Sequence, residues 1–190
     1  MRFVSNNVIE IDRELSDLDL FTLDFVNILR QHTNYVIVSG YVSILLGRAR
    51  ASEDIDIIIP MLAKTKFMRL LKGIKQAGFY CLNSEDENEI YDYLKDNLAA
   101  RFAKEDVVIP NVELKFAKNK IDELTLNKAI TVKLNKESII ISSLELQIAF
   151  KEIVLKSPKD IEDAEHIRAV AKGHLDMALI KRYGAMLDGF

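Results

Sequence analysis

Two aspartates, Asp54 and Asp56, stand one residue apart at the start of an apolar stretch, Ile57 to Ile59. Side chains alternate between the two faces of a β-strand, so both carboxylates are expected on one face and Ile55 on the other. Adjacent carboxylates repel each other, and a divalent cation relieves that repulsion. Mg²⁺ suits such a pair because it prefers oxygen ligands and keeps positions open for water and phosphates; Mn²⁺ is the alternative. A lone Asp-x-Asp is also common at solvated strand ends, so its context decides.

A turn of small residues precedes this pair. Tyr35 to Ser39 has the pattern of a short buried strand, and Gly40 leads into a helical stretch that ends near Gly47. Backbone N–H groups at such a turn are free to bind phosphate oxygens, and a side chain larger than serine would keep a triphosphate away. Ser-Gly is also an ordinary turn sequence. Its position ahead of Asp54 makes it a candidate phosphate site.

Together these features resemble a known signature. Ser39-Gly40, thirteen residues and then Asp54-Ile55-Asp56 resemble the motif of the DNA polymerase β-like nucleotidyltransferase superfamily. The stretch from Arg50 to Asp56 is similar to the Arg-x-[Ser/Thr]-x-Asp-Ile-Asp of its small prokaryotic branch, which includes the AbiEii-like nucleotidyltransferase toxins. The resemblance is strongest over residues 36–60. Ser39 departs from the motif, because the family usually has its first glycine there.

The resemblance implies a third carboxylate on a neighbouring strand. Asn111 to Ala117 alternates apolar Val112, Leu114 and Phe116 with polar residues, and Glu113 projects to the polar side. In the implied reaction Glu113 would complete the cation site and help to deprotonate the attacking hydroxyl. The alternative is an exposed glutamate beside an exposed lysine on an edge strand.

Further roles follow from the same resemblance. Arg50 and Ser52 would brace the loop before Asp54 or touch the triphosphate. Lys151 would meet the triphosphate as a point charge. Asp160 and Asp163 would orient the basic residues or cap a helix, although surface pairing at helical spacing accounts for them equally well.

The composition bounds the class of protein. The chain has 190 residues, a formal net charge of -3 and one cysteine, Cys81. These values favour a soluble, cytoplasmic protein without a disulfide framework, and any nucleic-acid contact would need a local basic surface. No apolar run approaches the length of a membrane span. Ligand spacing is absent from the histidines, which are His32, His166 and His174.

The hydrophobic patterns predict an α+β fold, with a mixed β-sheet flanked by helices and a helical C-terminal part. The expected strands are 35–39, 54–59, 101–102, 107–109, 111–117, 130–134 and 138–141. The expected helices are 16–32, 40–47, 61–77, 85–99, 142–155, one after residue 158 and one from about residue 175. We expect a nucleotidyltransferase core at 1–141 and a helical region at 142–190 packed on it.

The expected activity is transfer of a nucleoside monophosphate from an NTP to an acceptor hydroxyl on RNA, protein or a small molecule. The toxin-like branch also implies a cognate partner protein. An inactive nucleotide- or partner-binding module on the same scaffold is the main alternative, and a glycosyltransferase is a more distant one. A basic helix would contact RNA phosphates or form a solvated face; its residues are Lys64, Lys66, Arg69, Lys72 and Lys75.

Overall fold

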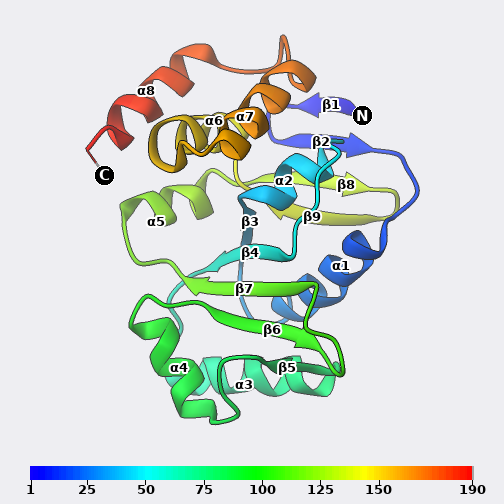
Figure 1. Cartoon of the computed structure of the whole chain (residues 1–190), viewed down its shortest axis with the longest axis vertical. Helices are drawn as coiled ribbons and strands as arrows, with labels where there is room; N and C mark the ends of the chain where they lie inside the picture. The colour runs from blue at the N-terminus through cyan, green and yellow to red at the C-terminus, as the bar shows by residue number, and fades with distance from the viewer. Residues whose placement is uncertain (190) are drawn as a thin grey trace.

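Strand β4 (Asp54–Ile59) lies near the middle of one mixed β-sheet (Figure 1). In the computed structural model, which describes residues 1–189, it pairs antiparallel with β3 (Val36–Val38) and parallel with β7 (Asn111–Phe116). The other strands are β1 (Arg2–Ser5), β2 (Val8–Ile11), β5 (Phe79–Cys81), β6 (Ala100–Lys104), β8 (Ile130–Leu134) and β9 (Glu137–Ile141). Across the sheet of residues 1–189 the order is β1-β2-β8-β9-β3-β4-β7-β6-β5.

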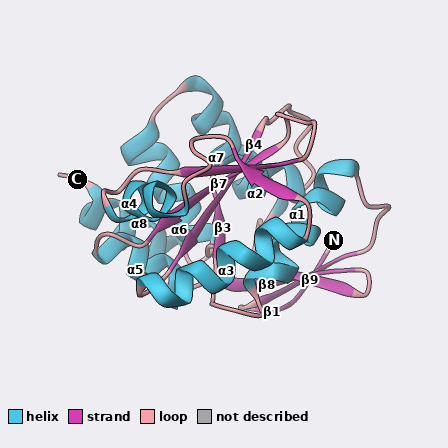
Figure 2. Cartoon of the chain, turned by 90° about the horizontal axis from the view of Figure 1, so that it is seen from below, coloured by secondary structure: helices cyan, strands magenta, loops and turns pink. Residues whose placement is uncertain are grey.

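Helices surround the sheet (Figure 2). They are α1 (Asp17–Leu29), α2 (Gly40–Leu45), α3 (Lys64–Gln76), α4 (Glu87–Lys95), α5 (Lys120–Asn127), α6 (Leu144–Phe150), the π-helix η1 (Lys151–Leu155), α7 (Pro158–Val170) and α8 (Met177–Leu187). Ser16 caps α1 as expected, because its hydroxyl accepts from the Asp19 N–H while the Asp19 carboxylate accepts from the Ser16 N–H. The mixed sheet with its helices confirms the predicted α+β class.

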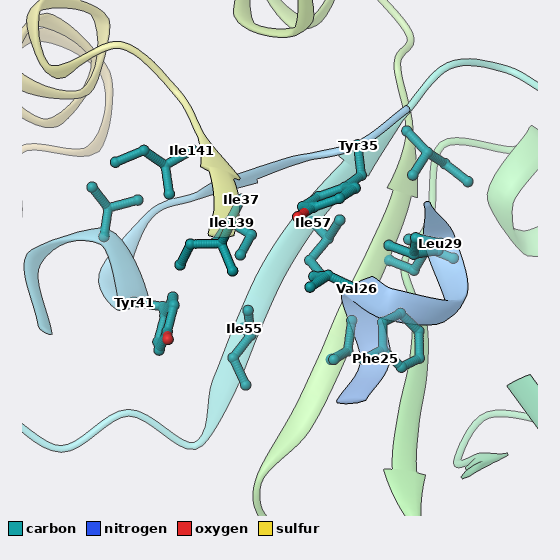
Figure 3. Close-up of a cluster of buried hydrophobic side chains, with 14 of the residues drawn as sticks. Phe25, Val26, Leu29, Tyr35, Ile37, Tyr41, Ile55, Ile57, Ile139 and Ile141 are labelled. Carbon is teal, nitrogen blue, oxygen red and sulfur yellow. The ribbon is translucent and has the colours of Figure 1, made fainter. Parts of the chain in front are cut away.

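The two faces of β4 have different environments. Ile55, Ile57 and Ile59 are fully buried, and Figure 3 shows Ile57 beside Val26 of α1 and Ile55 on the side of Tyr41 of α2. Asp54 and Asp56 project from the opposite face and are half-buried. The alternation of β4 therefore anchors the strand through its isoleucines and leaves its carboxylates on the accessible face.

Several predicted elements differ from those observed. The predicted strand 107–109 is wrong: this segment is an exposed loop, in which the Val107 N–H bonds the Lys104 carbonyl. The predicted helix 142–155 consists of α6 and the wider η1. Strands β1, β2 and β5 and helix α5 were not predicted.

The C-terminal helices share a core with the sheet. Leu144, Ile148, Ala164 and Ile167 belong to the same buried cluster as the isoleucines of β4. A smaller cluster joins α5, α6 and α8. The division at residue 141 stays a prediction. Among the described residues, no helix is long and apolar enough to cross a membrane.

Candidate active site

One row of side chains crosses four strands at the centre of the sheet. Val38 of β3 is in register with Asp56, Asp56 with Glu113 of β7, and Glu113 with Arg101 of β6. Residues in register on neighbouring strands point to the same face, so their side chains are close enough to interact. The register thus places Glu113, the carboxylate expected on a neighbouring strand, directly beside Asp56.

Asp54 opens β4 on the same face as Asp56. The Ser52 hydroxyl donates to the Asp54 carbonyl oxygen at 3.0 Å and lies 3.4 Å from Oδ1 of the Asp54 carboxylate. Ser52 therefore braces the entry to the strand. Within residues 1–189 no basic side chain forms an ion pair with Asp54, which leaves this carboxylate available to a ligand.

The carboxylates of Asp56 and Glu113, by contrast, form ion pairs with basic side chains. Lys115 Nζ lies 3.0 Å from Asp56 Oδ1 and 3.1 Å from Glu113 Oε2. Arg101 Nε donates to the other oxygen of Glu113, Oε1, at 2.9 Å. Burial raises the pKa of Glu113, but the hydrogen bonds from Arg101 and Lys115 outweigh it and leave the pKa below its usual value. Burial lowers the pKa of Lys115, and the charge of Asp56 with its hydrogen bonds outweighs that effect and raises it.

The donor chemistry of this face suits a divalent cation in part. Asp54 and Asp56 supply carboxylate oxygens on one side of one strand, which Mg²⁺ prefers. Over residues 1–189, however, no group of three or more His, Cys, Asp or Glu side chains is arranged to hold a metal ion. The two oxygens of Glu113 are bound by Lys115 and Arg101. The aspartate pair therefore fits a cation, and Glu113 as its third ligand stays a prediction.

The turn at Ser39 and Gly40 has an unusual backbone. Ser39 has φ 63° and ψ -136°, a conformation that favours glycine, and its side chain makes no capping hydrogen bond to α2. The nucleotidyltransferase motif that this sequence resembles usually has its first glycine at this position. At Gly40, a Cβ would lie 3.0 Å from the Arg50 guanidinium. The missing side chain of Gly40 therefore lets Arg50 pack directly against the turn.

Behind the turn lies a set of paired charges that we call the buried charge cluster: Arg48, Arg50, Lys151, Asp160 and Asp163. Lys151 Nζ is 3.1 Å from Asp160 Oδ1 and 2.8 Å from Asp163 Oδ2. Asp163 is fully buried and also accepts from Arg48 and, at 2.6 Å, from Arg50 Nη1. Asp160 further accepts from the Ser157 hydroxyl at the start of α7.

The buried charge cluster fixes the orientation of Arg50. Its side chain is only 10% exposed, and burial, with the nearby charge of Arg48, lowers its pKa. Lys151 is 1% exposed and enclosed by its two aspartates, so it is the less accessible of the two cations. Contact of Lys151 with a triphosphate stays a prediction. Arg50 is the member of the cluster that reaches the Ser39–Gly40 turn.

A cavity of about 310 Å³ opens beside the carboxylates. The sheet supplies Val38, Asp56, Ile58 and Lys115, the turn supplies Ser39, and helices α5 and α6 supply most of the rest of the lining. Its surface is mainly apolar with a few polar groups, which is typical of small-molecule sites.

One of those polar groups lacks a partner. The Ser142 hydroxyl is buried in the cavity wall, and its oxygen makes no hydrogen bond to any described residue. A buried polar atom without a partner is unfavourable unless a water molecule or a ligand binds it.

Sequence reasoning missed Lys115, Arg101 and Arg48. Lys115 had a signal, because it follows Glu113 by two residues and therefore shares its face. Arg101 and Arg48 had none, since the pairing of β6 with β7 brings Arg101 to Glu113, and Asp163 lies 115 residues after Arg48.

The remaining candidates lie in structural settings. His166 bonds the Leu46 carbonyl at 3.2 Å, and His174 stacks on Phe3. Cys81 is buried. The basic helix α3 packs through Phe67 against Phe116, on the face of the sheet opposite Glu113. Its lysines and arginine therefore lie away from the carboxylates.

The fold is similar to that of an antigenic nucleotidyltransferase-like protein from Paracoccidioides brasiliensis, whose crystal structure aligns with a TM-score of 0.54. The two chains are 19% identical, and the alignment covers 91% of this chain and 88% of that one. No protein-family model and no curated protein matches the chain. The likeness shows that this chain has a nucleotidyltransferase-like fold.

Proposed function

We propose that this protein is a divalent-cation-dependent nucleotidyltransferase that moves a nucleoside monophosphate from an NTP to an acceptor hydroxyl. The observation that carries the proposal is that Asp56 of β4 lies in register with Glu113 of β7, while Asp54 is on the same face of β4 and the Ser39–Gly40 turn lies next to Asp56. The nucleotidyltransferase-like fold is consistent with it.

Each part of the site has a task in this proposal. Asp54 and Asp56 would hold Mg²⁺ or Mn²⁺, which when bound supplies charge neutralisation at the transferred phosphoryl group. The backbone N–H groups of Ser39 and Gly40 would bind the triphosphate, and Arg50 lies against this turn to add positive charge. The cavity beside Asp56 would receive the nucleoside. Positioning and charge neutralisation would then supply the rate enhancement.

The acceptor would be a hydroxyl of RNA, a protein or a small molecule. The similarity of the stretch from Arg50 to Asp56 to the toxin-like branch supports a toxin–antitoxin role with a cognate partner protein. A panel of these acceptors, each incubated with the same labelled NTP, separates the three classes.

The test is transfer of label from each α-labelled NTP in the presence of Mg²⁺ or Mn²⁺. Changing both Asp54→Asn and Asp56→Asn keeps the side-chain shapes and removes the two charges, so transfer should fall by at least about a hundredfold. The matched control is Glu10→Gln, which removes a paired carboxylate from β2 far from the site. Transfer that survives the double change at the wild-type rate contradicts the proposal.

A non-catalytic nucleotide-binding module is the second candidate. The strained backbone at Ser39 and the pairing of both Glu113 oxygens with basic side chains favour it. Calorimetric binding of NTP without turnover for any acceptor of the panel would establish this alternative.

A further inference from the structure

The carboxylates of the site already have a cation between them. Lys115 Nζ bridges Asp56 Oδ1 at 3.0 Å and Glu113 Oε2 at 3.1 Å. Because Lys115 follows Glu113 by two residues on β7, its side chain rises from the same face and reaches both groups without a change in the strand. The ammonium group therefore stands where a second metal ion would have to bind if it were to join Asp56 to Glu113.

Arg101 strengthens this arrangement from the neighbouring strand. It lies opposite Glu113 in the register of β6 and β7 and donates to Oε1 at 2.9 Å, while Lys115 binds Oε2. Glu113 thus has a basic partner at each oxygen. Asp54, by contrast, has no ion pair within the described residues, and Asp56 is paired through Oδ1 alone.

The sum of the charges also indicates that Lys115 and Arg101 replace a metal ion at Glu113. Asp54, Asp56 and Glu113 carry three negative charges, and Lys115 and Arg101 carry two positive charges. One divalent cation brings this set to a total of plus one. Two divalent cations would give the same total on three carboxylates without basic partners. The two side chains therefore supply the positive charge of one metal ion.

We propose that Lys115 is a resident cation of the site, which takes the position of a second metal ion while Arg101 completes its charge, so that the protein binds a single divalent cation at Asp54 and Asp56. This inference rests on the proposed function. Lys115 acts as a positioning residue, because it holds Glu113 beside Asp56. The Ser142 hydroxyl, buried and without a partner in the adjoining cavity, leaves a hydrogen-bonding position there for a water molecule or a ligand.

The experiment counts Mn²⁺ ions, added alone as the probe, from the electron paramagnetic resonance signal of the unbound ion. Wild-type protein should bind one Mn²⁺ per chain, and Lys115→Met should bind two, because Asp56 and Glu113 then lose their shared cation. Lys115→Arg should bind one, since it restores the charge. Lys133→Met is the matched control: this strand lysine pairs with Glu10 outside the site, and its loss should leave the count at one.

Two ions in the wild type, none in the wild type, or one in Lys115→Met would each overturn the inference. The wild-type count needs no variant, so it decides even if Lys115→Met does not fold. Label transfer from NTP, measured separately, tests the proposed function. One Mn²⁺ per chain without transfer refutes the function alone, and transfer with two ions per chain refutes the resident cation alone.

Discussion

Replacing Asp163 by asparagine tests the buried charge cluster. The change keeps the size of the side chain and removes one negative charge at a fully buried position. Arg48, Arg50 and Lys151 all donate to this carboxylate. An asparagine amide oxygen accepts hydrogen bonds but cannot balance three positive charges. We expect Asp163→Asn to destabilise the fold and to release Arg50 from the Ser39–Gly40 turn.

The size of the effect follows from the partners that remain. Removing one member of a buried ion pair costs about 3–5 kcal/mol. Lys151 keeps Asp160, 3.1 Å away, and Arg48 keeps Glu162, so the lower end of that range applies, at about 3 kcal/mol. For a domain of this length each kcal/mol lowers Tm by about 2–4 °C, which predicts a fall of about 6–12 °C.

Urea denaturation and calorimetry measure the free energy of unfolding and Tm. Glu162→Gln is the matched control, because Glu162 also pairs with Arg48 but its side chain is 65% exposed. An exposed pair contributes less than about 1 kcal/mol, so this control should stay close to wild type. If Asp163→Asn is no less stable than Glu162→Gln, the buried charge cluster does not stabilise the protein and our reasoning is refuted.

The stability of the protein should also depend on the backbone at Ser39, on the pH below neutrality and on the Tyr41 hydroxyl of α2. Ser39→Gly should stabilise the protein by about 1 kcal/mol, because glycine adopts φ 63° without strain; Ser39→Ala, measured in the same urea titration, should give no gain. Glu113 and Asp160 have pKa values below their ordinary 4.5 and 3.8, so the stability they confer is present above those values and is lost as the pH falls through their folded pKa values. Unfolding free energies measured from about pH 7 to pH 3 should therefore decrease at the acid end, and less steeply in Glu113→Gln. Tyr41→Phe should cost about 1.5–3 kcal/mol in chemical denaturation, because the Tyr41 hydroxyl donates at 2.7 Å to the buried Asp19 carboxylate; an unchanged midpoint would contradict this.

Local patterns predicted the parts of the site that lie within single strands. The alternation of Asp54 to Ile59 and of Asn111 to Phe116 gave the faces of both strands correctly, because side-chain direction in a strand depends only on position along it. The parallel register that sets Asp56 beside Glu113 was not readable, since nothing in either strand encodes its neighbour.

Longer-range features could not be predicted for the same reason. The nearby Asp160 and Asp163 were expected to orient the basic residues, and they do pair with Lys151. The burial of Lys151 was not predicted, because the local sequence does not show that η1 and α7 pack together around it. Strand β1 lacks apolar alternation and is mostly exposed, so it carries no strand signal. The apolar run Val107 to Ile109 has the composition of a strand but forms a loop, because composition alone does not provide a partner strand to pair with.

The parallel pairing of β2 with β8 has a consequence for synthesis of the chain. Val8 pairs with Thr131, about 120 residues later. At about 5–20 residues per second, a ribosome needs roughly 6–25 s to make the intervening segment. During that time Val8, Ile9 and Ile11 have no partner strand on that side, whereas β4, β6 and β7 can already assemble. Among the paired strands of residues 1–189, β2 therefore waits longest for its partner, and its apolar residues stay exposed to wrong pairing during that time.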